Sequence, residues 1–139
     1  MERSYSAMMT RDTFLSRAQY LLLYGGVGQE TFGAERYLNQ LFYTSWAWKQ
    51  SRDHIIIRDN GCDLGVLGHE IHDKVFVHHI NPITPQQLKD EDPVLYDPEN
   101  LILVSHNTHN AIHYGDIAML PQPLVERKPG DHLLWERMW

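Results

Sequence analysis

The chain has 139 residues, of which 42% are hydrophobic and 22% are charged, as expected for one globular domain with a modest core. Its longest apolar runs, "YLLLY" and "LILV", are far shorter than a membrane-spanning helix, and Met1 to Thr10 lacks the apolar stretch of a signal peptide. The single cysteine, Cys62, excludes an internal disulfide and a zinc site built from cysteines, so we expect a cytoplasmic protein.

The net charge of −6 argues against a strongly basic surface for nucleic acid, but the acidic residues are unevenly distributed. Residues 1–60 contain seven Lys or Arg and six Asp or Glu, whereas residues 61–100 contain two and eight. Most of this excess lies in "KDEDPVLYDPE", Lys89 to Glu99, which we interpret as a solvated loop. Basic residues elsewhere remain available to line one face.

Three helices are predicted in the first 60 residues. Residues 13–24, "TFLSRAQYLLLY", have apolar residues at helical spacing and are followed by two glycines, which is typical of a helix end. Residues 31–43 form the second helix, with Thr31 as a candidate N-cap. Ser45 is expected to cap the third, "WAWKQSRDHIIIRD", although its "HIII" is also good strand sequence. The aromatic residues in this region are interpreted as core side chains: Phe42, Tyr43, Trp46 and Trp48.

The pattern changes at Cys62. The segments "CDLGVLG" and "KVFVHHI" are short and rich in β-forming residues, which predicts an antiparallel hairpin. A long loop, rich in proline and acidic residues, follows from Asn81 to Pro98. In "ENLILVSHNTHNAIHYG", Ser105 is a plausible N-cap of a short helix and Gly115 its stop.

The order of these elements predicts an α+β fold in a single domain covering residues 1–139. Residues 1–50 supply a helical support, and residues 52–115 contain the predicted hairpin and the histidine-bearing helix. Residues 116–139 contain three prolines and are expected to form an irregular C-terminal wrap, with a last helical turn at Leu133 to Trp139.

Five of the nine histidines fall between residues 78 and 113. His109 and His113 are four residues apart, so on a helix both rings lie on one face and can bind one metal ion. Adjacent residues of a strand point to opposite faces, so one ring of the pair His78-His79 can supply a third ligand. Three protein ligands leave room for water and substrate, which is typical of a catalytic metal site. The other ring of the pair is then placed to act as a general base.

These residues resemble the HNH nuclease family, whose core is the ββα-metal motif. The resemblance is carried by "VHHINP" on the second strand of the expected hairpin, by "ENL" after the loop, and by "HNAIH" on the helix. It spans about Arg52 to Gly115. The segments "RDNGCDLG", "HHINPIT", "DPENL" and "THNAIHYG" are especially similar to small free-standing HNH endonucleases of tailed bacteriophages.

The resemblance implies a role for each matched residue. His78, His109 and His113 resemble the metal ligands, and His79 resembles the general base. Asn100 resembles the residue that anchors the loop and fixes the base imidazole through a hydrogen bond. Many relatives also have two CxxC pairs that bind a structural zinc. Here Ser105 and Thr108 occupy such places and Cys62 is the single cysteine, so a second, structural zinc is not expected.

The implied activity is a metal-dependent DNA endonuclease that hydrolyses phosphodiester bonds, by nicking or by cutting both strands. One divalent ion is expected, with zinc, manganese, nickel, cobalt and magnesium all open. The expected partner is double-stranded DNA, and the resemblance adds phage terminase or other packaging proteins in the host cytoplasm. Further candidates for substrate contacts are Arg52, Arg58, His106 and Asn110.

Alternatives remain for several of these residues. Arg52 and Arg58 either clamp the scissile phosphate or form salt bridges with neighbouring Asp53 and Asp59. A rival function is a non-catalytic, metal-stapled DNA-binding module, which would keep three ligands but has no need for a second histidine at position 79. A second rival is an ordinary globular domain whose histidines bind metal only by accident.

Overall fold

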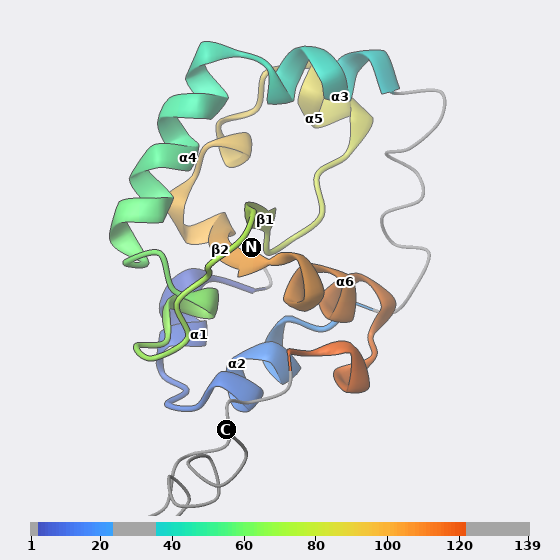
Figure 1. Cartoon of the computed structure of the whole chain (residues 1–139). Helices are drawn as coiled ribbons and strands as arrows, with labels where there is room; N and C mark the ends of the chain where they lie inside the picture. Colours follow the sequence, from blue (N-terminus) through green and yellow to red (C-terminus); the bar gives the residue numbers. More distant parts are fainter. Residues whose placement is uncertain (1–2, 24–35, 122–139) are drawn as a thin grey trace, which may run out of the picture.

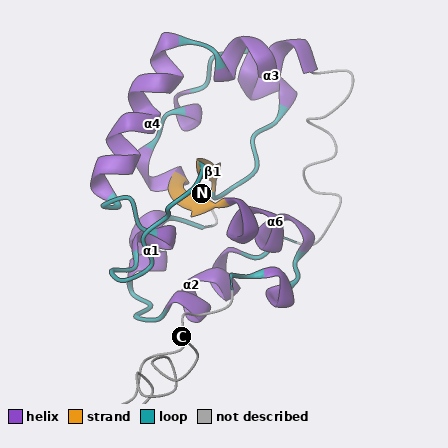
Figure 2. Ribbon diagram, viewed as in Figure 1, coloured by secondary structure: helices purple, strands orange, loops and turns teal. Residues whose placement is uncertain are grey.

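The computed structural model describes residues 3–23 and 36–121, which form a mixed α+β fold (Figures 1 and 2). Within these residues there are six α-helices and one two-stranded antiparallel sheet. The elements, in chain order, are α1 Tyr5–Met9, α2 Phe14–Leu21, α3 Arg36–Tyr43, α4 Trp46–Arg58, β1 Val75–His79, α5 Pro85–Lys89, β2 Leu101–Ser105 and α6 His106–Tyr114. The predicted α+β class is therefore confirmed, and along the chain β1 is followed by α5, then by β2 and α6.

The predicted caps Ser45 and Ser105 are confirmed, and Thr13, which was not predicted as a cap, also caps a helix. The side chains of Thr13, Ser45 and Ser105 accept hydrogen bonds from the backbone N–H three residues later, at the starts of α2, α4 and α6. The segment "HIII" is helical and belongs to α4. Helix α2 ends at Leu21, three residues earlier than predicted. The glycines at 25–26, the candidate cap Thr31 and the predicted last turn at 133–139 lie outside the described residues.

The predicted pairing of the strands was wrong. Strand β1 pairs with β2, from Val75 opposite Ser105 to His79 opposite Leu101, rather than with "CDLGVLG". The latter segment contains a 3₁₀ turn at Asp63–Gly65, in which Leu64 has a φ of 54°, a conformation that no regular strand contains. The expected loop from 81 to 98 also contains a helix, α5, which begins with a capping box at Thr84.

The sheet separates two hydrophobic clusters. Alternate residues of β2 point to opposite faces, so Ile102 and Val104 pack with residues of α1, α2 and α6, whereas Leu101 and Leu103 pack with residues of α3, α4 and α5. Figure 1 shows α3 and α4 on one side of the sheet and α1 and α2 on the other. All four residues are fully buried, which explains why "LILV" is a continuous apolar run rather than an alternating one.

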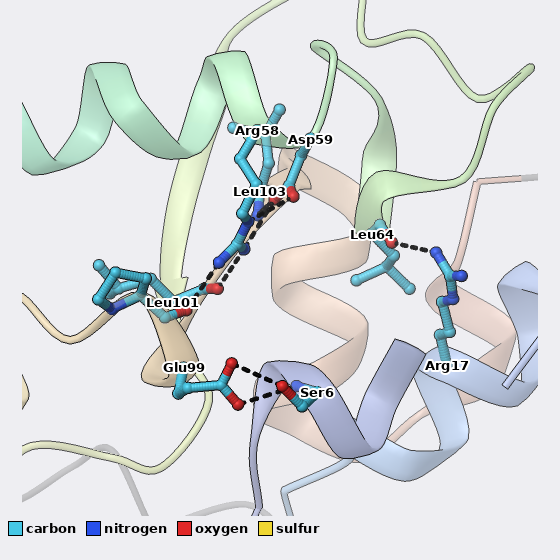
Figure 3. A network of polar contacts seen from close by, with 9 residues as sticks. Ser6, Arg17, Arg58, Asp59, Leu64, Glu99, Leu101 and Leu103 are labelled. Atoms are coloured by element: carbon cyan, nitrogen blue, oxygen red, sulfur yellow. Dashed lines mark hydrogen bonds and ion pairs between the residues drawn. The ribbon is translucent and has the colours of Figure 1, made fainter. Parts of the chain in front are cut away.

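The outer edge of β2 is satisfied by side chains instead of a third strand. Arg58 donates to the carbonyl oxygen of Leu101, Asp59 accepts from the N–H of Leu103 (Figure 3), and Asp63 accepts from the N–H of Ser105. The three bonds are 2.6, 3.0 and 3.1 Å long. A buried strand edge must find such partners, so the end of α4 and the segment after it fix the position of β2 and of the helix that follows it.

The aromatic residues expected in the core divide into two groups. Phe42 and Trp48 are buried, whereas Tyr43 and Trp46 are 44% and 73% exposed. Within the described residues, no helix is long and apolar enough to cross a membrane.

Candidate metal centre

Three histidines from β1 and α6 converge. In β1, Phe76 and His78 lie opposite Val104 and Ile102, so they share the face that α6 covers. On α6, His109 and His113 are one turn apart. Ser105 caps the start of this helix, and Gly115 ends it in the left-handed conformation with a φ of 65°. The local sequence therefore determines the length of the helix that presents both rings.

The ligand nitrogens of His78, His109 and His113 all lie within 4.8 Å of one another. The Nε2 atoms of His109 and His113 are 2.9 Å apart. Nitrogens bound to one tetrahedral zinc, at about 2.0–2.1 Å from the ion, are separated by roughly 3.3 Å. The Nε2 of His78 is buried and has no hydrogen-bond partner. An unsatisfied buried nitrogen is costly, so this donor set fits a divalent ion that would bind all three rings.

The electrostatics of the cluster favour neutral rings. Burial lowers the pKa of His78 well below its ordinary value, and the neighbouring imidazoles of His109 and His113 lower it further. Burial, followed by the proximity of His113, lowers the pKa of His109 to about 4, and burial also lowers that of His113. A metal binds only the neutral imidazole. The three rings are therefore ready to bind a metal at neutral pH without losing a proton.

Aromatic packing holds the ligand rings in place. The ring of Phe76 stacks on that of His109 at a centroid distance of 5.5 Å and an interplanar angle of 5°. The ring of His78 lies edge-on to those of His109 and His113, at 5.4 and 5.0 Å. A ligand fixed by packing loses little freedom when it binds an ion.

His79 points to the other face of β1, as the strand geometry predicts. Its ring stacks on Trp48 of α4 at 5.2 Å and contacts Phe42 of α3 at 5.9 Å. Its Nε2 lies 3.1 Å from the carbonyl oxygen of Leu95. Because a carbonyl can only accept, the Nε2 carries the proton and the Nδ1 is left as a proton acceptor. Burial lowers the pKa of His79 to about 4, so the ring is neutral at pH 7.

Asn100 anchors the loop that precedes β2. Its Oδ1 accepts hydrogen bonds from the backbone N–H and the side-chain amide of Asn81, at 2.8 and 2.9 Å, and its Nδ2 donates to the Asn81 carbonyl oxygen. The side chain is 1% exposed. The His79 ring donates its hydrogen bond to the carbonyl oxygen of Leu95, not to Asn100. Asn100 thus acts on the loop, and its expected direct bond to the base imidazole is not formed.

A small pocket of about 80 Å³ is shared by the three clustered histidines and His79. It is lined by Tyr43, Val77, His78, His79, Pro82, Ile83, His109 and His113. Since the lining includes residues from both faces of β1, the pocket lies at the edge of that strand that does not pair with β2. The three clustered histidines and His79 therefore line one common space, although His78 and His79 leave the strand in opposite directions.

The candidate substrate-binding residues are placed differently from one another. Arg58 forms the salt bridge with Asp59 at 2.9 Å and donates to the carbonyl oxygens of Pro98 and Leu101 (Figure 3). Its guanidinium also lies 3.6 Å from the ring centroid of Tyr5. Arg58 thus makes structural contacts, as the salt-bridge alternative predicted. Arg52 is half-buried one turn after Trp48, on the same face of α4.

His106 and Asn110 lie on the solvent side of α6. Their side chains are 3.2 Å apart, and the ring of His106 contacts Phe76 at 5.9 Å. His106 also lines an open groove of about 780 Å³ between the segment 67–74 and the start of α6. None of the three clustered histidines lines this larger groove. Its size therefore does not make it the reactive site.

Two supporting residues could not be recognised from the sequence. Leu95 acts through its backbone carbonyl, which every residue possesses, so no sequence signal marks it. Asp63 accepts hydrogen bonds from Ser105 and Thr108 at the start of α6, at 2.8 and 2.6 Å. Burial raises the pKa of the Asp63 carboxyl, and these hydrogen bonds partly offset that shift. An aspartate in an otherwise apolar segment was the only available hint.

Comparisons with protein-family models, with curated proteins and with solved structures find no match.

Proposed function

We propose that this protein is a metal-dependent phosphodiesterase that cleaves DNA, with a ββα-metal core of the HNH type. The observation that supports this most strongly is the common pocket. Three neutral imidazoles, one with an unpartnered buried nitrogen, share it with a fourth imidazole that has a free proton-accepting nitrogen. A purely structural metal site has no need for the fourth ring.

His78, His109 and His113 would hold one divalent ion. When bound, such an ion supplies positive charge that stabilises the phosphate and the leaving oxygen as negative charge develops. Imidazole ligands suit zinc, nickel, cobalt and manganese, and an open site also admits magnesium.

His79 would accept the proton of the attacking water. The Leu95 carbonyl holds its Nε2–H, so the Nδ1 has the free lone pair. The stacked ring of Trp48 restricts the rotation of the imidazole and keeps this nitrogen in place. A general base in such a position typically contributes roughly 10²–10⁴-fold to the rate.

The choice of DNA as substrate rests on the order of the residues. His78-His79 at the end of β1, Asn100 before β2 and the pair His109 and His113 on α6 follow the pattern of the HNH family. Arg52 is the remaining candidate for a phosphate contact from α4. With a net charge of −6, DNA affinity should be weak and sequence-tolerant.

The test is cleavage of supercoiled plasmid by the purified, untagged protein, with EDTA and with each candidate metal in turn. We expect nicked or linear DNA only when a divalent ion is present. His79→Ala should abolish most of the activity, whereas His54→Ala, an exposed histidine of α4, should behave like the wild type. The absence of cleavage with every metal, in a protein that binds both metal and DNA, would favour the DNA-binding module instead.

A further inference from the structure

Tyr43 belongs to the common pocket although its sequence context suggested a core residue. It is the last residue of α3, and it lines the pocket together with the four histidines. Its ring meets those of Phe42 and Trp48 edge-on, at 4.9 and 5.4 Å. Since Trp48 in turn stacks on His79, one aromatic cluster fixes both Tyr43 and the candidate base.

Tyr43 carries a phenol hydroxyl, and the residue lines the pocket. The residue as a whole is 44% exposed, yet burial raises the pKa of its phenol. The hydroxyl has no hydrogen-bond partner within residues 3–23 and 36–121. An unpartnered phenol on a residue that lines a pocket is available to a ligand.

The remaining lining of the pocket offers no other side-chain O–H. Val77, Pro82 and Ile83 are apolar, and the Nε2–H of His79 already donates to Leu95. The ligand rings would direct their lone pairs, not their N–H groups, towards an ion. An anionic phosphodiester needs hydrogen-bond donors as well as a cation, particularly where charge develops during the reaction. Tyr43 is placed to supply one.

We infer that the Tyr43 hydroxyl donates a hydrogen bond to a non-bridging oxygen of the phosphodiester bound in this pocket. This inference rests on the proposed function, and it adds a substrate-contacting residue outside the β1–β2–α6 unit. It also gives α3 a role in the site, because the position of the hydroxyl depends on how this helix packs against α4.

The experiment compares Tyr43→Phe with Tyr37→Phe. Tyr37 lies on the same helix and is 70% exposed, and it does not line the pocket, so it is a matched control for the loss of one hydroxyl. Both changes keep the aromatic ring and its packing. Each zinc-loaded variant is titrated with dimethyl phosphate and followed by ³¹P NMR, and plasmid nicking and bound zinc are measured on the same samples.

For Tyr43→Phe we expect the dissociation constant for dimethyl phosphate to rise about tenfold, the usual cost of losing one hydrogen bond to a charged group. Nicking should slow by on the order of 10², as when one donor to a developing oxyanion is removed. Tyr37→Phe should change neither quantity, and bound zinc should be the same in all three proteins.

The outcomes separate the two proposals. If Tyr43→Phe matches Tyr37→Phe in both binding and nicking, the role of Tyr43 is refuted while the nuclease proposal stands. If the wild type does not nick plasmid but binds dimethyl phosphate through Tyr43, the nuclease proposal fails and the hydrogen bond stands. If the wild type binds no dimethyl phosphate, the inference about Tyr43 is overturned.

Discussion

The two adjacent histidines of β1 should have separable functions. His78→Ala removes one of three converging nitrogens, so it should strip the metal. His79→Ala removes a ring that leaves β1 on the opposite face from His78, so it should leave bound metal close to one ion per chain and strongly slow cleavage. The contrast between the two variants carries more information than either one alone.

The structure sets the magnitudes. His78 is 3% exposed and its Nε2 has no protein partner, so its loss should weaken metal binding by more than the roughly 10–100-fold caused by losing a supporting residue. His79→Ala should slow cleavage by roughly 10²–10⁴-fold, the contribution of a general base. It should also lower stability by about 2 kcal/mol, because it leaves a space beside Trp48 and an unpaired carbonyl at Leu95.

The assay measures bound metal by mass spectrometry, nicking rate and thermal unfolding on the same preparations. Nicking is compared at a temperature at which His79→Ala is fully folded, so that its lower stability does not contribute to the rate. The reasoning is refuted if His79→Ala strips the metal while His78→Ala keeps both metal and activity. Full activity in both variants would place the reactive site elsewhere.

Three further predictions concern the support of the site. Asp63→Asn should lower the free energy of unfolding by about 1–3 kcal/mol and weaken metal binding, because the carboxylate accepts hydrogen bonds from both Ser105 and Thr108 at the start of α6. A calorimetric titration that gives the variant and the wild type equal metal affinity would contradict this. Arg58→Met should destabilise the fold by about 3–5 kcal/mol, because it leaves Asp59 buried without its partner. Arg52→Met should instead reduce DNA binding without changing denaturant unfolding. The opposite pattern would reverse the roles of the two arginines. The metal-free protein should lose stability as the pH falls from about 6.5 to about 4, because burial lowers the folded-state pKa of His79 and His109 to about 4 while the unfolded chain takes up protons from 6.5 downward. Each of these groups should contribute about 3 kcal/mol, present in full above pH 6.5 and lost towards pH 4, and a flat urea-unfolding profile across this window would disprove the burial.

The sequence by itself determined the features that depend on neighbouring residues. Ser45 and Ser105 mark helix starts because a short hydroxyl side chain can bond to the N–H three residues later, and Gly115 marks an end because it readily adopts a positive φ. The spacing of His109 and His113 placed both rings on one helical face, and the alternation of a strand sent His78 and His79 in opposite directions. These relations need only backbone geometry.

Only the tertiary structure decided which segments meet. "KVFVHHI" is good strand sequence, but its composition does not predict which strand it pairs with. It pairs with "LILVS", whose fully buried residues pack into two hydrophobic clusters, one on each face of the sheet. In the same way, the half-buried Arg52 and the salt-bridged Arg58 look equivalent in sequence, and Tyr43 looks like any aromatic residue of an amphipathic helix. Their roles depend on contacts between residues far apart in the chain, and such contacts leave no local pattern. The pairing of His109 with His113 is thus a local property, whereas their meeting with His78 and the pocket that they share depend on the whole fold.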